Sequence, residues 1–435
     1  MIHFLPVFRA RLAAVLLFAL AWFANPALAQ SLNVDIVGGV KTATPLVVVP
    51  FGQTGGTPPA TDVADVMRND FNRSGKFRSL ARPDIVEFPT RGQDIKFATW
   101  RLLKQDYITV GNITDVGNGM LQVEYELWDV NQQQSLLHQQ MPPVPAGDLR
   151  GVAHQIADII YEKITGVRGA FWTRIAYVTA VGLGNNTTYS LVAADSDGFN
   201  PQVVARSRES LLSPSWSPDG RKIAYVLFES GNSQIYIQDI TTGSRQLVAA
   251  HPRGVNGAPA FSPDGSRLAI ALSYVGNLEL FTLDLASRQE TRLTRNLAID
   301  TEPVWAPDGQ SIIFTSDRSG RPQLYQMPVG GGAEQRITFQ GQFNANASVS
   351  YDGKQIAMVQ GNGNVYRIAV MDRSLGDQVR FLSPGPIDES PSFAPNASML
   401  LYAANEGRRG VLYAVSADGM VRQRLVLANG DVREP

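Results

Sequence analysis

The stretch SPSWSPDGRKIAYV, residues 213–226, recurs four more times along the chain. The other copies are APAFSPDGSRLAIA from Ala258, EPVWAPDGQSIIFT from Glu302, NASVSYDGKQIAMV from Asn346 and SPSFAPNASMLLYA from Ser390. All five copies share a turn residue, and these residues are spaced 45, 44, 44 and 44 positions apart: Asp219, Asp264, Asp308, Asp352 and Asn396. A fixed period of this length indicates a repeat architecture.

Each repeat has the composition of four short strands. The Pro-Asp-Gly turn follows the first strand, because proline presets φ, aspartate bonds its own backbone and glycine accepts positive φ. In the first full copy KIAYVLF (222–228), QIYIQDI (234–240) and RQLVAA (245–250) supply the other three strands. Four strands every ~44 residues are typical of a β-propeller blade, so we interpret the turns as structural rather than catalytic.

The number of blades follows from the two ends of the repeat region. RIAYV at 174–178 matches KIAYV at 222–226, but GAFWT precedes it where the other copies have an SPDG-type strand. The residues that open the units are Pro214, Pro259, Pro303, Ala347, Pro391 and Pro435. Pro435 therefore opens a sixth unit, and GDVREP (430–435) is predicted to pair with the first blade. We expect six blades and a short closing strand.

Residues 1–29 have the features of a secretory signal peptide. Arg9 and Arg11 precede the apolar run LAAVLLFALAWFA (12–24), and an A-x-A sequence predicts cleavage between Ala29 and Gln30. The run is shorter than the ~20 residues that a membrane-spanning helix needs. We therefore expect an exported protein with no membrane span after cleavage.

The composition of the chain excludes several classes of function. Removing the two leader arginines leaves 36 basic and 39 acidic residues, without a basic stripe, which argues against nucleic acid as a partner. The sequence contains no cysteine, so disulfides, thiolate metal sites and thiol nucleophiles are excluded.

Residues 30–166 lack the repeat and are predicted to form a small α/β domain, with the propeller over 167–435. Strands are expected at 32–37, 45–51, 107–116, 119–130 and 135–142, and helices at 61–75, 94–105 and 146–166. The inward faces of the first and last helices are Val63, Val66, Met67, Phe71, and Val152, Ile156, Ile159, Ile160. Because Gly38 and Gly39 weaken a strand, residues 30–40 could instead be a mobile arm.

The search for catalytic motifs gives little. The mature chain has three histidines, and it has no zinc-protease, nucleophile-elbow or phosphate-loop motif. His154 is interpreted as a polar-face or core-edge residue, and His251, in a loop between blades, as a possible partner contact. We expect no cofactor, no metal site and no catalytic residue.

The loops from one blade to the next are more informative, since they converge at one mouth of a propeller channel. They read VNGAP, IDTEP, NANA, IDESP and DVREP. Their polar residues either cap turns or form a mildly acidic mouth that receives a partner. Asp300 and Glu302 could suggest a glycosidase pair, but the loops lack aromatic or basic groups that grip sugars. A propeller enzyme or a glycan-binding module in the periplasm remains the alternative.

The sequence resembles the TolB family of periplasmic propeller proteins of the Tol–Pal envelope system. The resemblance covers essentially the whole mature chain and rests on PLVVVPF, NRSGKF, EKITGVRGAFWTRIAYV, SPSWSPDGRKIAYVLFESG, NGAPAFSPDG, TEPVWAPDG and SDRSGRPQLY. The run across the hinge between the domains is the most specific of these. Two features differ from the family pattern: PRGVNGAP has no histidine just before its Asn-Gly-Ala, and members usually run a few residues beyond the equivalent of Pro435.

The resemblance implies a non-catalytic, monomeric periplasmic adaptor that supports outer-membrane integrity and invagination during cell division. It implies that the propeller mouth binds the Pal lipoprotein and that the N-terminal arm binds TolA, within the wider Tol–Pal complex. Carried over by position, the Pal-binding residues are Asn256, Gly257, Ala258, Asp300, Thr301, Glu302, Asn344, Asn346, Asp388, Glu389 and Ser390. The TolA-binding arm is Leu32, Asn33, Val34, Asp35, Ile36, Val37, Gly38, Gly39 and Val40.

Overall fold

The computed structural model describes residues 43–229, 231–425, 427 and 430–435. The predicted signal peptide, its cleavage site, the strand at 32–37 and the arm at 30–40 lie outside the described residues. The described chain from residue 43 onward belongs to one compact unit. Within it, no helix combines the length and the apolar character needed to span a bilayer.

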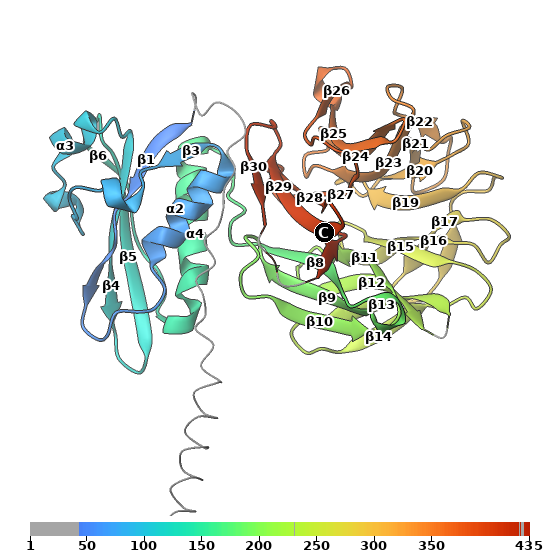
Figure 1. The fold of residues 1–435 in the computed structure, drawn as a ribbon, viewed down its shortest axis with the longest axis horizontal. Helices are drawn as coiled ribbons and strands as arrows, with labels where there is room; N and C mark the ends of the chain where they lie inside the picture. Colours follow the sequence, from blue (N-terminus) through green and yellow to red (C-terminus); the bar gives the residue numbers. More distant parts are fainter. Residues whose placement is uncertain (1–42, 230, 426, 428–429) are drawn as a thin grey trace, which may run out of the picture. The chain divides into compact units, whose positions relative to one another are not determined.

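The first part of the described chain is a seven-stranded mixed sheet packed against helices (Figure 1). Its strands are β1 (Thr44–Val48), β2 (Gly52–Thr54), β3 (Phe77–Ser79), β4 (Tyr107–Asp115), β5 (Met120–Asp129), β6 (Gln134–Gln140) and β7 (Val144–Pro145), and its helices are α2 (Val63–Ser74), α3 (Phe97–Leu102) and α4 (Leu149–Thr165). The strand order is β3-β1-β4-β5-β6, with β2 paired to β4 and β7 to β5. β1 is parallel to both of its neighbours, whereas β4, β5 and β6 form an antiparallel meander.

Alternation along β1 divides the core between the two faces of this sheet. Leu46 and Val48 pack with α2 and α4, while Val47 and Val49 pack with Trp100 of α3 on the other face. Both helical faces predicted from the sequence are confirmed, and of their eight residues only Ile159 is not fully buried. The predicted helix over 94–105 is shorter in the structure, since a 3-10 turn occupies Gly92–Asp94 and α3 covers only Phe97–Leu102.

Of the two interpretations of His154, the polar-face one is wrong, whereas a position at the edge of the core agrees with its burial. Its side chain is 2% exposed on α4, and its Nδ1 lies 2.6 Å from Oδ2 of Asp70 on α2. The helical pattern located His154 next to an apolar stripe, but it gave no sign that a carboxylate 84 residues away would accompany it into the interior.

The second part of the chain is a six-bladed β-propeller, as predicted (Figure 1). Blade 1 contains β31 (Asp431–Arg433), β8 (Arg174–Val181), β9 (Thr188–Asp195) and β10 (Gln202–Ser207), and blade 2 contains β11 (Leu211–Trp216), β12 (Lys222–Glu229), β13 (Asn232–Asp239) and β14 (Arg245–Ala249). Blade 3 contains β15 (Asn256–Phe261), β16 (Arg267–Leu272), β17 (Glu279–Asp284) and β18 (Glu290–Arg292), and blade 4 contains β19 (Asp300–Trp305), β20 (Ser311–Ser316), β21 (Gln323–Pro328) and β22 (Gln335–Arg336). Blade 5 contains β23 (Phe343–Val349), β24 (Gln355–Asn362), β25 (Val365–Asp372) and β26 (Gln378–Phe381), and blade 6 contains β27 (Asp388–Phe393), β28 (Met399–Glu406), β29 (Arg409–Ser416) and β30 (Arg422–Arg424).

The C-terminal strand closes the ring. β31 pairs antiparallel with β8, and Arg433 lies opposite Val178, so the C-terminus lies beside β8 (Figure 1). β31 has three residues, whereas the first strands of the other blades have six or seven. The structure therefore confirms that the C-terminus closes the ring, and the closing strand is short, as predicted. Blade 6 packs tightly against β31, since a Cβ added at Gly410 would lie 2.7 Å from the carbonyl oxygen of Val432.

The Pro-Asp-Gly turns hold the blades' first two strands together. Asp219 accepts hydrogen bonds from the backbone N–H of Arg221 and from the Ser217 hydroxyl, and these bonds, that from Ser217 first, lower the pKa of Asp219. Gly220 has φ +66°, a conformation that favours glycine. The carboxylate is thus occupied with its own turn, which supports the structural interpretation.

Candidate protein-binding mouth of the propeller

A two-residue bulge interrupts the first strand of blades 2 to 6. The pairing register shifts between Leu212 and Ser215 in blade 2, and equivalent shifts occur in the next four blades. The first bulged residue has positive φ in every case, and Glu434, the residue after β31, completes a ring of six: Ser213, Ala258, Glu302, Asn346, Ser390 and Glu434, with φ between 48° and 55°. Non-glycine residues in this conformation are uncommon and cluster at functional sites, and bulges re-aim side chains.

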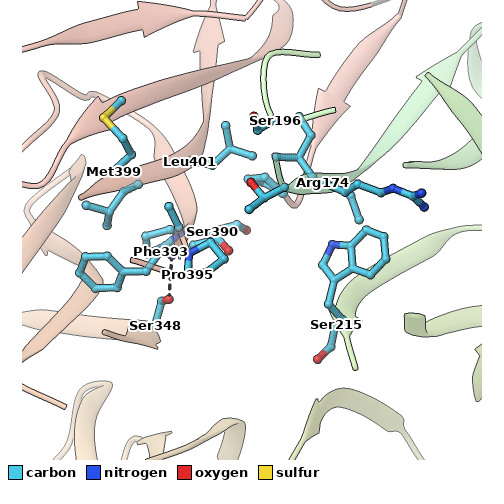
Figure 2. Close-up of a pocket in the computed structure, with 18 of the residues that line it drawn as sticks. Arg174, Ser196, Ser215, Ser348, Ser390, Phe393, Pro395, Met399 and Leu401 are labelled. Atoms are coloured by element: carbon cyan, nitrogen blue, oxygen red, sulfur yellow. Dashed lines mark hydrogen bonds between the residues drawn. The ribbon is translucent and has the colours of Figure 1, made fainter. Parts of the chain in front are cut away.

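All six bulged residues line a cavity of about 1680 Å³. Other parts of its wall come from the hinge between the domains and from blades 1, 2 and 6. In Figure 2, Ser348, Ser390, Phe393 and Pro395 lie on one side of the open space, and Arg174 and Ser215 lie on the opposite side. The cavity therefore includes the central channel, which the bulged residues line, and it continues to residues of α2, α4 and the hinge.

Two carboxylates of the ring tie neighbouring blades together. Oε2 of Glu302 accepts from the backbone N–H of Asn346, 2.8 Å away in the next blade, and from the hydroxyl of Thr315 at 2.7 Å. Glu434 accepts in the same way from the backbone N–H of Ser213. Each bond links one bulge to the corresponding bulge of the next blade, so the strained residues hold one another in place.

The ring holds two carboxylates, Glu302 and Glu434, and the pKa of Glu434 is raised. Burial raises the pKa of Glu434 first of all; the bond from Ser213 opposes this, and the charges of Glu389 and Glu302 raise the pKa further. A raised pKa means that the folded protein binds this proton more tightly than the unfolded chain does. The contribution of this proton to the stability of the fold is complete below the ordinary glutamate pKa, and it is lost as the pH rises through the raised pKa of Glu434.

We therefore predict that Glu434→Gln gains stability relative to the wild type as the pH is raised from about 4 to about 8. The glutamine oxygen still accepts from Ser213, but it carries no charge to bury. Thermal unfolding at several pH values measures the difference. Glu209→Gln, at an exposed position, is the matched control and should show no such trend. A difference between Glu434→Gln and wild type that does not change with pH would contradict the prediction.

Four of the predicted site residues are buried and cap the loops that enter the mouth. They share one repeat position and are 0–3% exposed: Asn256, Asp300, Asn344 and Asp388. Asn256 donates to the carbonyl oxygens of Ser233 and His251, both within 3.0 Å. The structure thus places this quartet beneath the loops, where it fixes the positions of the exposed residues around it.

The remaining predicted residues are partly exposed on the first strands. Gly257, Thr301 and Glu389 pair with the second strand just before each bulge, and Ala258, Glu302, Asn346 and Ser390 lie in the bulges. The eleven positions are therefore brought to one end of the channel, but they divide into a buried group and a group that faces the channel or its rim.

An apolar rim was missed by the sequence reasoning. Val255, Ile299 and Ile387 each come one residue before a member of the buried quartet and are about half exposed, at 50%, 49% and 48%. Leu297 lies in the loop before β19 and is 100% exposed, and Phe339 lies in the loop before β23 and is 73% exposed. The same repeat alignment that identified the polar residues contained this signal. Exposed apolar residues gathered at one site mark interaction surfaces.

His251 lies in a loop that enters this face. Its Nε2 is 2.9 Å from Oε1 of Glu290, and its ring stacks on that of Tyr274 with 4.0 Å between the centres. The side chain is 30% exposed, so it is held within its own blade while keeping one edge at the surface.

A mixed α/β domain followed by a six-bladed propeller, with a polar ring and an apolar rim at its mouth, defines a two-domain β-propeller protein. The family model of the TolB amino-terminal domain matches residues 32–136, and that of the TolB beta propeller domain matches residues 161–435. The chain belongs to the TolB family.

Individual members of the family are similar to this chain over both domains. "Tol-Pal system protein TolB" of Xanthomonas campestris pv. campestris (strain B100) is 61% identical over 422 residues, which cover 97% of this chain and 95% of that protein. The protein of the same name from Xanthomonas euvesicatoria pv. vesicatoria (strain 85-10) is 62% identical over 408 residues, 93% of this chain and 92% of that one. The crystal structure of TolB from Acinetobacter baumannii is 40% identical and superimposes with a TM-score of 0.84 over 93% of this chain and 98% of that chain.

Proposed function

We propose that this protein is a non-catalytic periplasmic adaptor of the Tol–Pal system, which binds Pal at the propeller mouth and TolA through its N-terminal arm. In this role it supports outer-membrane integrity and invagination during cell division. Membership of the TolB family across both domains supports the assignment to the system, since curated relatives carry the name Tol-Pal system protein.

The observation that carries the Pal-binding part is the mouth itself. Exposed apolar side chains lie beside the polar ring, so the mouth offers both apolar surface for a partner to bury and carboxylates that can bind its polar groups. The bulged backbone is fixed by bonds between blades, so the ring is preformed and little conformational entropy is lost on binding.

Capture of partners from envelope extract tests the assignment. The mature protein, immobilised, should retain a peptidoglycan-associated lipoprotein and TolA, both identified by mass spectrometry. Recovery of neither partner, or release of a soluble product from glycan or peptide substrates, would favour a propeller enzyme or glycan-binding module and contradict the adaptor.

Deleting residues 30–40 is expected to abolish TolA capture and to leave Pal capture within about twofold of the wild type, a change of less than ~0.5 kcal/mol. The reason is that the arm and the mouth are separate contact sites in the proposal. Binding of purified TolA and Pal to the deletion variant, measured by calorimetry, checks this. Ala258→Arg is the reciprocal control, which should retain TolA. TolA binding that survives the deletion would contradict the arm assignment.

A further inference from the structure

A cluster of buried charged residues joins α2 and α4 to the first propeller blade. Asp70 and Arg73 come from α2, and Arg150 and His154 from α4. Asp195 ends β9, and Asp197 lies two residues later in the turn. His154, Asp195 and Asp197 present ligand atoms that all lie within 4.8 Å of one another. None of these residues belongs to the mouth.

The orientation of His154 is fixed from one side only. Its Nδ1 is 2.6 Å from Oδ2 of Asp70, and Asp70 is itself held by Arg73 at 2.9 Å. A carboxylate accepts hydrogen bonds, so Nδ1 carries the proton and the Nε2 lone pair points away from Asp70. A histidine ligand whose other nitrogen donates to a carboxylate is the usual arrangement at metal sites, where the carboxylate fixes the tautomer and the ring orientation.

The Nε2 atom of His154 has no hydrogen-bond partner among the described residues, although the side chain is only 2% exposed. Oδ2 of Asp197 lies 4.0 Å from this nitrogen. This separation is too long for a hydrogen bond. Four-fold coordination with Zn–N and Zn–O bonds of about 2.0–2.2 Å would place the two atoms about 3.4 Å apart. A shift of roughly half an ångström would therefore let both atoms bind one ion.

The local charge favours a cation. Four carboxylates, of Asp70, Asp158, Asp195 and Asp197, lie near three guanidinium groups, of Arg73, Arg150 and Arg174, which leaves one net negative charge when His154 is neutral. Burial, and then the charge of Asp197, raise the pKa of Asp195, as expected where carboxylates gather. Arg150 contacts Oδ2 of Asp197, and this oxygen keeps a second lone pair for another partner.

We propose that His154, Asp195 and Asp197 bind one divalent metal ion of the zinc class. A nitrogen and two carboxylate oxygens are ligands that zinc accepts, and a water molecule would complete four-fold coordination. Two of the ligands come from the propeller and one from α4 of the α/β domain, so the ion cross-links the two domains. Metal binding then stabilises the junction, because the assembled site exists only in the folded chain.

Calorimetric titration of the full mature protein with zinc, after treatment with a chelator, tests the proposal. One equivalent should bind, the unfolding temperature should rise, and X-ray absorption should report one imidazole and oxygen ligands. His154→Gln and Asp195→Asn should each weaken zinc by at least tenfold, and Asp70→Asn by about 10- to 100-fold through loss of orientation. His138→Gln and His251→Gln, which alter two other histidine–carboxylate pairs, are matched controls and should bind as the wild type does.

Three results would overturn the site. They are no binding by the wild type, wild-type affinity in both His154→Gln and Asp195→Asn, and loss of binding in the control variants instead. If His154→Gln fails to fold, Asp195→Asn still decides the question, since the Asp195 side chain is 29% exposed and its change is milder. Equal binding of calcium or magnesium that ignores His154 would contradict the zinc class.

Discussion

Replacing Ala258 by arginine is expected to weaken Pal binding by about 30-fold or more, a loss of ~2 kcal/mol. Ala258 is a bulged residue of blade 3 that lines the channel, and its small side chain leaves room at the mouth. An arginine would fill that room and would have to be desolvated on binding. Since the position already has positive φ with a non-glycine residue, the substitution adds no new backbone strain. Calorimetry or surface plasmon resonance with purified Pal measures the loss.

The matched control is Ala286→Arg. It makes the same chemical change on the same blade, at an exposed turn between β17 and β18 that is not part of the mouth. Glu302→Lys is a second test, because it removes the acceptor for Asn346 and reverses a charge of the ring. Both mouth variants should unfold within a few degrees of the wild type. Unchanged Pal affinity in Ala258→Arg and Glu302→Lys would rule out the mouth as the binding face.

The sequence predicted the propeller because its defining features are local and repeated. The Asp219 turn, the alternating strands and the 44-residue spacing are all short-range patterns, and they recur five times. The number of blades followed from the same arithmetic, since Pro435 lies in register with the earlier units. Closure by β31 against β8 confirms that register over a separation of more than 250 residues.

The division of the mouth into buried and lining residues could not be predicted in the same way. Strict alternation along a strand would place Asp300 and Glu302 on the same face. The bulge between Thr301 and Val304 breaks that alternation, so Asp300 is buried while Glu302 turns to the channel. Nothing in IDTEP signals where the register slips, because the slip depends on pairing with β20.

Long-range polar contacts could not be predicted from the sequence either. His154 and Asp70 approach only because α2 and α4 pack on the same face of the sheet, and Asp197 joins them from blade 1. Helical periodicity identifies the apolar stripe of each helix, but it does not say which polar residue beside the stripe meets a partner. Short strands such as β3, parallel to β1, were missed for a similar reason.

Asp300→Ala is expected to destabilise the propeller by about 3–5 kcal/mol, the usual result of removing one partner of a buried ion pair. The Asp300 carboxylate is fully buried and accepts from Nη2 of Arg318 at 2.9 and 3.0 Å and from Nδ2 of Asn296 at 2.8 Å. Burial works against the charge of Arg318, but the bonds to Asp300 and Glu334 outweigh it and raise the pKa of Arg318. Without Asp300 the guanidinium keeps Glu334 as its one carboxylate partner among the described residues, and its Nε still donates to the Ser316 hydroxyl.

Calorimetric unfolding measures this, and a loss of that size should lower the transition temperature of the propeller by roughly 5–15 °C. Glu334→Ala is the matched control, because it removes the other carboxylate that pairs with Arg318. The Glu334 side chain is 26% exposed, so its loss should cost less than about 1 kcal/mol of stability. Asp300→Asn, which keeps an oxygen acceptor, should fall between the two. Equal and small shifts for Asp300→Ala and Glu334→Ala would show that Asp300 is not the structural support of the loop. If the stability losses follow the order Asp300→Ala, Asp300→Asn, Glu334→Ala, any loss of Pal binding in Asp300→Ala is explained by the displaced loop. The loss in Ala258→Arg, by contrast, arises at the contact with Pal itself.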